Sequence, residues 1–530
     1  MAWYNEARVA QPGSVILNDW LARRQASRSA QAAPVPRRPS VRAFVAGQTT
    51  RLTAGFVATN TSIDSDLAGG LDAIRARSRA QSQNNAYGAK FIKMARNNIV
   101  GPSGFTLQSR AADLKFTKEG PKVIPDRLAN RAIEAAFAAW SAKGVCDITG
   151  QNSFRGICNL FVGAVAGDGE FLARRIRGKD VNAYGYALQI LDIDRLQVSD
   201  NRRLANGNIV RMGVELDSRC RPVAYWLRTQ HPGETGPGAQ AGTTVERVPA
   251  AEIFHCFRPI RPEQRRGVPW MHPAMQDLYH LGEFDQSALV AARKGADTLG
   301  FFVSPDGSPP PIGDSIDDNG NPIEVSVPGT WDTLPEGFDV RSFDSKYPND
   351  VYAVFAKACL RRIASGWGVA YNALGNDLEG VNFSSIRAGT LEERDNWMDA
   401  QEWMIEEFLI PVFEDWLEMA LLNGAIVMEN GSALPAAKIQ KFSVHTWQGR
   451  RWQWVDPLKD IESAIAAIEA GLDSPQRIAA QQGRDIEDVL DDIAAFQAMA
   501  KEKNVELGPP NLPKPAQADP AIDGQLPAAQ

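Results

Sequence analysis

The chain has 530 residues, of which 44% are hydrophobic and 23% charged, and its net charge is −6 at pH 7. These values are ordinary for a folded protein, exclude a mini-scaffold without a large core, and predict three to four domains at roughly 150 residues each. The five cysteines form no CxxC pair and are odd in number. This argues against a disulfide framework or a zinc finger and favours a reducing cytosol.

The sequence also shows no targeting or membrane signal. It begins Met-Ala-Trp-Tyr-Asn-Glu without a charged-then-apolar signal peptide, and no run approaches 18 apolar residues. We therefore expect a protein that folds inside a cell and has no transmembrane helix.

Charge is distributed unevenly along the chain. Residues 1–51 hold eight arginines against Glu6 and Asp19, a net charge of +6, which leaves −12 for the remainder. The Arg/Ala/Ser/Pro-rich stretch 22–50 is typical of a flexible arm or linker. Such a basic arm binds phosphates or an acidic protein, and a solvated tail is the equally supported alternative.

Apolar periodicity predicts regular structure from about Ser65 onward. Helices are expected from about residue 65, over 86–99 and over 125–140, with a short strand over 105–108. From Gly169 to Cys256 the pattern changes to strands separated by Asp, Gly, Asn and Pro clusters, predicted at 171–176, 187–193, 209–216, 224–228 and 252–257. This combination predicts an α+β fold with mostly antiparallel strands.

Helices dominate the second half of the chain. The periodicity predicts long helices over 274–296, 350–365 and 385–422, and two or three shorter ones within 457–503. Between the first two, residues 304–348 lose helical character, with short strands expected near Val325 and Val340. The third helix contains Pro411, which predicts a kink because proline lacks an N–H and clashes with the carbonyl four residues back. A disordered tail is expected from Gly508.

Motifs for enzyme chemistry are missing from the sequence. There is no GxxxxGK[ST] loop, no HExxH and no GxSxG, so neither nucleotide binding nor a known hydrolase motif is indicated. His272 and His280 lie about two turns apart on one predicted helix, too far to share a metal ion. We expect no catalytic centre, no metal site and no cofactor.

Two local clusters resemble catalytic groups. His255 and Cys256, close to Glu252, resemble a thiol–imidazole pair, but neighbouring strand residues point to opposite faces. Asp168 and Glu170 flank Gly169 in a tight turn, where carboxylates usually accept hydrogen bonds from local backbone. Neither cluster therefore predicts an enzyme.

The long helix after residue 385 is strongly acidic. Ten carboxylates lie between Leu391 and Glu418, opposed by Arg394 alone. Like charges four residues apart destabilise an isolated helix. Either this is a solvated outer face, or a neighbouring subunit supplies basic partners.

Several segments, taken in order, resemble one protein family. They are Cys146–Gly150, Gly167–Glu170, Leu188–Leu196, GVELDSRCRPVAYWL at 213–227, RVPAAEIFHCFRPIRPEQRRGVPWMHP at 247–273, IASGWGVAYNALGNDLEGVNFSSIR at 363–387, and Trp454–Pro457. Along roughly residues 50–500 the chain resembles the lambda-type family of phage portal proteins. One departure is that Ala370 follows the Gly366–Val369 element where the family commonly has proline, which should loosen the start of the loop.

The resemblance implies a portal-type fold: an α+β chain with a mixed α/β wing, a helical stem, a small α/β clip, a kinked long helix and a helical crown. The implied boundaries are a flexible basic arm 1–50, wing 51–270, stem helix 271–297, clip 298–348, stem helix 349–366, tunnel loop 367–385, kinked helix and return to the wing 386–455, crown 456–505 and disordered tail 506–530. Within this scheme the channel residues would be Asn372, Asn376, Asn382, Ser384 and Ser385 on the tunnel loop.

The same resemblance implies a ring, usually of twelve subunits, in the virion. Its expected partners are other copies of the chain, double-stranded DNA, the terminase large subunit, a head–tail connector protein and the major capsid protein or scaffold, without a membrane. Twelve copies would carry about −72, and an acidic passage lets phosphates slide. Lys357 and Arg361, four residues apart on a stem helix, would line the channel or pair with a neighbouring subunit. A nucleic-acid-binding capsid-associated protein and a cysteine hydrolase remain the alternatives.

Overall fold

The computed structural model describes residues 57–117, 120–234, 244–297, 300–303, 315–316, 322–323, 339–342, 350–379, 383–452, 457–482 and 486–502, with Arg51 and Gly55. The chain separates into two compact units, Met1–Ser62 and Ile63–Gln530, and almost all described residues belong to the second. The predicted arm 1–50 and tail 506–530 lie outside the described residues.

The Ile63–Gln530 unit begins with three helices, α2 (Ile63–Ala68), α3 (Leu71–Asn84) and α4 (Ala86–Ile99). Asn85 separates the last two, and its side chain accepts hydrogen bonds from the N–H groups of Tyr87 and Gly88. This N-cap satisfies donors that the first helical turn leaves free. The helix predicted over 86–99 is confirmed.

A small strand and two helices follow. Strand β1 (Thr106–Ser109) pairs antiparallel with β16 (His445–Gln448), so the predicted strand near 105–108 is confirmed with a distant partner. Sequence periodicity missed the hairpin β2 (Ala112–Thr117) and β3 (Gly120–Pro125) and also helix α6 (Phe154–Asp168). Helix α5 (Arg127–Trp140) matches its prediction.

Two antiparallel sheets form the centre of the unit. One has the order β11–β4–β5, and the other the order β10–β9–β8–β7–β6. Their strands are β4 (Phe171–Arg177), β5 (Tyr186–Leu191), β6 (Arg202–Arg203), β7 (Ile209–Arg211), β8 (Val214–Leu216), β9 (Pro222–Arg228), β10 (Val245–Pro249) and β11 (Ile253–Cys256). These observations confirm an α+β fold with mostly antiparallel strands.

The single strand predicted over 209–216 is wrong. Met212 and Gly213 both have positive φ, 48° and 85°, and Arg211 pairs with Val214 across them. Two consecutive residues of this kind form the tight turn that reverses a hairpin, so the chain folds back into β7 and β8. Alternation of apolar residues continues through the turn and hides it.

Further along, α7 (Met275–Asp297) and α8 (Asp350–Trp367) confirm two predicted helices, and short strands lie between them in the sequence. Strand β12 (Gly300–Val303) pairs with β15 (Asp339–Ser342), and β13 (Ser315–Ile316) pairs with β14 (Pro322–Ile323). The strand predicted near Val340 is therefore confirmed, whereas Val325 lies outside the described residues. Among the described residues, no helix is both long enough and apolar enough to cross a bilayer.

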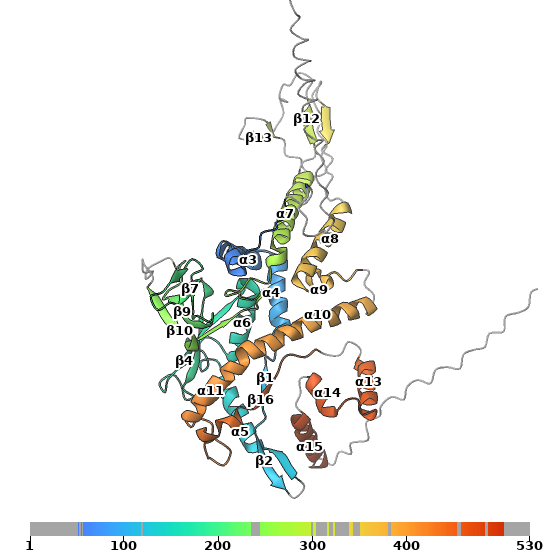
Figure 1. Ribbon diagram of the computed structural model, residues 1–530. Coiled ribbons are helices and arrows are strands. Elements are labelled where there is room, and N and C mark those ends of the chain that lie inside the picture. The colour runs from blue at the N-terminus through green and yellow to red at the C-terminus, as the bar shows by residue number, and fades with distance from the viewer. Residues whose placement is uncertain are drawn as a thin grey trace, which may run out of the picture. The chain divides into compact units, whose positions relative to one another are not determined.

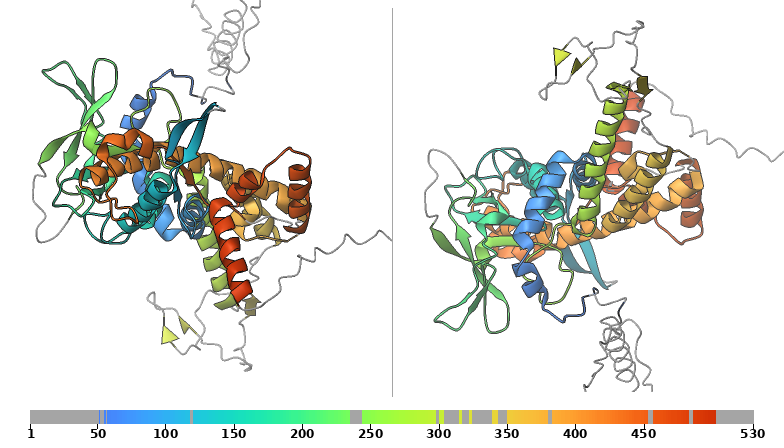
Figure 2. Two further views of the ribbon diagram at one scale, coloured as in Figure 1. Left: turned by 90° about the horizontal axis from the view of Figure 1, so that it is seen from below. Right: turned by 90° about the horizontal axis from the view of Figure 1, so that it is seen from above.

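The acidic long helix is interrupted just before its proline. Helix α10 (Phe383–Met404) crosses α4, passes into a π-helical turn at Ile405–Leu409, and continues as α11 (Ile410–Leu422) (Figures 1 and 2). A π turn adds one residue to the helix and is a common origin of kinks. The irregularity predicted from Pro411 thus lies in the five residues that precede Ile410.

Pro411 also explains a contact made by Cys256. In a regular helix the N–H of residue 411 would bond the carbonyl of Glu407, but proline has no N–H. The Cys256 thiol lies 3.6 Å from that carbonyl oxygen and donates to it. Cys256 on β11 therefore donates a hydrogen bond to the backbone of the neighbouring helix.

The remaining elements are mostly helical. They are the 3₁₀ turn Ala436–Lys438, α12 (Ile439–Phe442), α13 (Pro457–Glu469), α14 (Pro475–Gln481) and α15 (Ile486–Glu502). The two or three helices predicted within 457–503 are confirmed as three.

Aromatic side chains form the middle of the core. Phe137 on α5 makes edge-to-face contacts with Trp416 and Phe413 on α11 and with Trp447 on β16, at ring-centre distances of 5.0, 5.9 and 5.6 Å. Edge-to-face pairs of this kind contribute about 0.5–1.5 kcal/mol each beyond their buried area. They join the first and last thirds of the sequence.

Beside this aromatic core lies a buried ion network centred on Glu170. Its carboxylate accepts hydrogen bonds from Arg75 at 2.6 Å and from Arg266 at 2.9 Å, and His255 Nε2 lies at 2.5 Å. The side chains of Glu170 and Arg266 have no exposed surface. Glu170 thus joins α3, β11 and the segment before α7, and it corrects the expectation that this carboxylate bonds local backbone.

The network sets the ionisation of Glu170. Burial alone raises the pKa of its carboxyl, but the charge of Arg266, the hydrogen bond from His255 and the charge of Arg75 hold the pKa well below its usual range. Glu170 is therefore ionised, and its partners depend on that charge.

We expect Glu170→Gln to lower the free energy of unfolding by about 3–5 kcal/mol, because it leaves the buried Arg266 without a counter-charge and removes one carboxylate partner of Arg75, which keeps Asp194 at 3.1 Å. Chemical denaturation measures this value. The matched control is Glu252→Gln, which removes a partly exposed partner of Arg174 and should cost less than about 1 kcal/mol. Equal losses in the two variants would contradict the assignment.

We also expect Cys256→Ala to cost about 1–3 kcal/mol more than Cys158→Ala, because it removes the thiol that donates to the Glu407 carbonyl. Both thiols are 2% exposed, so the control accounts for the lost side-chain packing. Differential denaturation of the two variants provides the measurement, and identical midpoints would argue against the contact.

Candidate functional site

The candidate site lies on the α7–α8 pair, where the predicted stem residues are located. Arg362 near the end of α8 bonds Asp277 near the start of α7 at 2.7 Å. Tyr352 near the start of α8 donates to Asp285 in the middle of α7 at 2.9 Å. The two helices therefore run antiparallel, side by side (Figure 1).

The two ends of this pair differ in burial. Near the base, Leu278 and Ile363 are fully buried, and Trp367 donates from Nε1 to the Met271 carbonyl at 3.1 Å. Towards the other end, Leu289 and Val354 are 71% and 69% exposed. The base is thus anchored in the core, while the far half presents apolar side chains to solvent.

Lys357 is held within its own chain. Its Nζ lies 3.0 Å from an Asp377 oxygen and 2.9 Å from a Glu379 oxygen. Tyr371 donates to Asp377 at 2.6 Å. The hydrogen bond from Tyr371, followed by that from Lys357, lowers the pKa of Asp377 to about 2, and the same two carboxylates raise the pKa of Lys357.

Arg361, one turn further along α8, has a different environment. Its guanidinium lies 5.2 Å from the ring centre of Tyr371, a cation–π distance. No described carboxylate lies within ion-pair distance of this side chain. The structure therefore separates the two cations that the sequence grouped together, and their roles in a channel or between subunits stay a prediction.

The predicted tunnel loop is partly helical. Asn372 lies on the short helix α9 (Tyr371–Gly375), and Asn376 ends it with a left-handed φ of 52°. Lys90 on α4 donates to the Asn376 side chain. Ser384 and Ser385 lie in the first turn of α10, and Asn382 lies outside the described residues. The predicted tunnel loop 367–385 thus contains helical parts, and its place in a channel stays a prediction.

The start of this segment is also fixed rather than loosened by Ala370. Trp367 and Val369 are buried, and the Ala370 N–H donates to Glu393 at 3.4 Å. A proline at this position would lack that donor. Compared with proline, alanine at position 370 makes the backbone less rigid but provides the N–H for a hydrogen bond to Glu393 on α10.

Some carboxylates of the acidic helix have partners within the chain. Asp415 bonds Arg177 at 2.7 Å and lies 3.3 Å from Arg175, and Arg258 bonds Asp399. Others are exposed, among them Glu392, Asp395, Glu402, Glu406, Glu414 and Glu418. The solvated-face interpretation therefore describes part of this helix, and basic residues of the same chain pair with Asp399 and Asp415.

One group of side chains has spacing suited to a cation. Ligand atoms of Asp192, Asp194 and His231 lie within 4.8 Å of one another. However, Arg79 already bonds both carboxylates. Moreover, the Gly233 N–H donates to Nδ1 of His231 at 3.0 Å, so in neutral His231 the proton resides on Nε2, 3.3 Å from Asp194. The group is an internal ion cluster rather than a cradle for a metal ion.

The thiol–imidazole pair is not formed. His255 faces Glu170, and Cys256 faces the Glu407 carbonyl on the opposite side of β11, as the strand geometry predicts. Burial raises the pKa of the Cys256 thiol, the reverse of what an attacking thiolate requires. The link between Glu170 and His255 escaped sequence reasoning because 85 residues separate them.

Sequence comparison identifies relatives of the chain. The family described as "Phage portal protein, lambda family" matches residues 49–401. The "Probable portal protein" of Halomonas phage phiHAP-1 is 37% identical over 472 residues, covering 88% of each chain. "Portal protein B" of Escherichia phage lambda is 22% identical over 491 residues, covering 88% of this chain and 89% of that one.

A solved structure titled "Neck of empty GTA particle computed with C6 symmetry" covers 77% of this chain and 93% of its own, at 13% identity and a TM-score of 0.41. This likeness is too distant to carry weight, so the assignment rests on the sequence matches. The match over residues 49–401 and the 37% identity to a phage portal protein show that the chain belongs to the lambda family of phage portal proteins.

Proposed function

We propose that this chain assembles with copies of itself into a dodecameric ring at one vertex of a phage capsid. Double-stranded DNA passes through the ring during packaging and ejection, and the ring docks the terminase large subunit and a head–tail connector protein. Assembly takes place in the host cytoplasm, beside the major capsid protein or scaffold. The role requires no cofactor, metal or catalytic residue of the chain.

The regions take their roles from the family. Residues 51–270 serve as wing, 271–297 and 349–366, which contain α7 and all but the last residue of α8, as stem, and 298–348 as clip. Residues 367–385 face the tunnel, 386–455 form the kinked helix and return to the wing, and 456–505 form the crown. The antiparallel α7–α8 pair supports the stem assignment, since its two helices flank residues 298–348 in the sequence.

The structural observation that best supports ring formation is the exposed apolar surface on the far half of the α7–α8 pair. Leu289, Val290, Val354 and Phe355 are 71%, 49%, 69% and 48% exposed. Large apolar side chains exposed together on two paired helices are typical of an interaction site. Neighbouring copies in a ring would cover it with the equivalent helices.

DNA transport through such a ring depends on weak contact. Phosphates bind strongly to unpaired Lys and Arg side chains, with counterion release driving affinity. Here Lys357 is opposed by Asp377 and Glu379, so this cluster carries a net charge of −1. A cluster of that sign next to a passage repels the duplex rather than holding it.

The purified chain should form a particle of about 695 kDa, twelve times the 57.9-kDa chain. Light scattering after size-exclusion chromatography provides the mass, and negative-stain imaging shows whether the particle is a ring. A species that stays monomeric under all conditions, including in infected cells, would sink the proposal. The nucleic-acid-binding alternative predicts instead that the monomer itself binds DNA with steep salt dependence.

Arg361→Glu should prevent ring assembly, because Arg361 has no described carboxylate partner in its own chain and is available to a neighbouring subunit. Lys357→Glu on the same helix is the matched control, and its rings should form because the Lys357 partners lie in the same chain. Ring mass and packaged DNA are measured for both. Arg361→Glu rings of normal mass with reduced packaging would instead assign Arg361 to DNA contact.

A further inference from the structure

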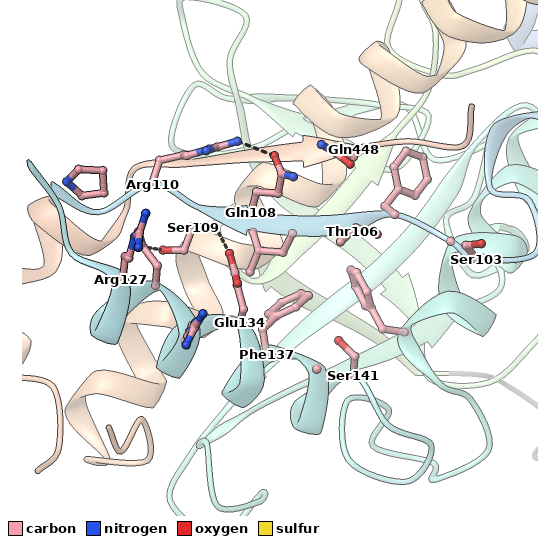
Figure 3. A pocket seen from close by; sticks show the side chains of 18 of the residues that line it. Ser103, Thr106, Gln108, Ser109, Arg110, Arg127, Glu134, Phe137, Ser141 and Gln448 are labelled. Atoms are coloured by element: carbon pink, nitrogen blue, oxygen red, sulfur yellow. Dashed lines mark hydrogen bonds between the residues drawn. The ribbon is translucent and has the colours of Figure 1, made fainter. Parts of the chain in front are cut away.

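A large groove lies along β1 and α5 and encloses about 1010 Å³. We call it the α5 groove, and Figure 3 shows it from close by. Its wall carries Arg110, Arg127, Arg131 and Arg155 but only one carboxylate from these elements, Glu134. The Glu134 carboxylate accepts a hydrogen bond from the Ser109 N–H at 2.7 Å. These five side chains carry a net charge of +3, and Asp491 and Asp492 of α15, which also line the groove, bring its whole lining to +1.

The floor of the α5 groove is apolar. Leu107, Phe137 and Phe154 line it, and all three belong to the buried core. These side chains are only 5–7% exposed, so the basic wall is the part of the groove that selects an occupant, and it suits a segment with an acidic edge.

Helix α15 has this character. Its sequence, IEDVLDDIAAFQAMAKE, places four carboxylates in its first seven residues and its one lysine near its end. Its side chains Ile493 and Phe496 are 46% and 54% exposed. The helix is thus acidic in its first two turns, and its apolar side chains Ile493 and Phe496 stay exposed in the folded chain.

A direct contact links the two. Val489, Asp491 and Asp492 of α15 line the α5 groove, and Asp491 lies 2.7 Å from Arg131. Both side chains of this pair are about two-thirds exposed, so the pair alone contributes less than about 1 kcal/mol. Stable docking therefore needs the other arginines of the groove and the contact of Val489 as well.

We propose that the α5 groove is the docking site of the chain's own α15, held by charge complementarity. Docking would fix the last helix of 456–505 onto the first third of the chain. The inference adds to the proposed function but does not depend on ring formation. Duplex DNA, the other polyanion that an arginine-lined groove suits, is the alternative to be tested.

Zero-length carbodiimide cross-linking tests the contact in the full-length protein. Arg131→Lys keeps the charge and introduces an amine, which couples to a carboxylate in direct contact. We expect mass spectrometry to find position 131 linked to Asp491 or Asp492 within one chain. The product should be lost in the Arg131→Lys/Asp491→Asn/Asp492→Asn variant and reduced in 1 M NaCl, where the screening length falls to about 3 Å.

The chain contains its own controls for this reaction. Lys441 lies 2.6 Å from Asp126, and Lys357 lies 2.9 Å from Glu379, so both links should form in every sample that is folded. Exposed Lys143, just beyond α5, should not link to α15. If the two internal links form and the 131–491 and 131–492 links do not, the proposal is overturned.

Two further outcomes would also overturn it. A link between two chains, seen at dimer mass under denaturing conditions, would assign the groove to a neighbouring copy. Loss of duplex binding in Arg131→Glu, without any cross-link to α15, would assign it to DNA. Light scattering on the same samples reports ring formation separately, so failure of docking and failure of the ring are distinguishable.

Discussion

The structure depends on a crossing of two backbone segments that only glycine permits. A Cβ at Gly169 would lie 2.4 Å from the Val268 carbonyl carbon, and one at Gly267 would lie 2.1 Å from the Gly169 oxygen. Gly169 also has a φ of 89°, which favours glycine. The crossing places Glu170 against Arg266 and so creates the buried ion network.

This crossing determines how the α7–α8 pair is held. The chain passes from Arg266 to Met271 and directly into the 3₁₀ turn that begins α7. Trp367, at the end of α8, bonds the Met271 carbonyl and packs on Phe91 of α4 at 4.7 Å. The start of α7 and the end of α8 are therefore held at one base, beside a buried ion network that needs well-placed partners. The pair can expose its other half without losing its orientation.

The sequence predicted helices correctly where the apolar periodicity of a single helix was visible without knowledge of its neighbours. The helices at 86–99 and 275–297 each have one buried face and one polar face, so their periodicity is visible. Helix α6 is buried on most sides, including Ile157, Phe161 and Val165, and so shows no polar face to indicate its period. The Lys357 cluster was missed for a different reason: its acidic partners lie on a separate segment, which only the fold brings within 3 Å.

The residues that looked reactive in the sequence form hydrogen bonds and ion pairs that stabilise the fold. Pro411 frees the Glu407 carbonyl, and Cys256 donates to it. His255 faces the Glu170 carboxylate, and Asp168 bonds Arg79. A buried polar group without a partner costs about 1–3 kcal/mol, so each of these contacts has a structural reason. These potentially reactive side chains therefore take part in structural contacts. This suits a protein that acts through a fixed shape, because a passage for DNA requires rigidity rather than a free nucleophile.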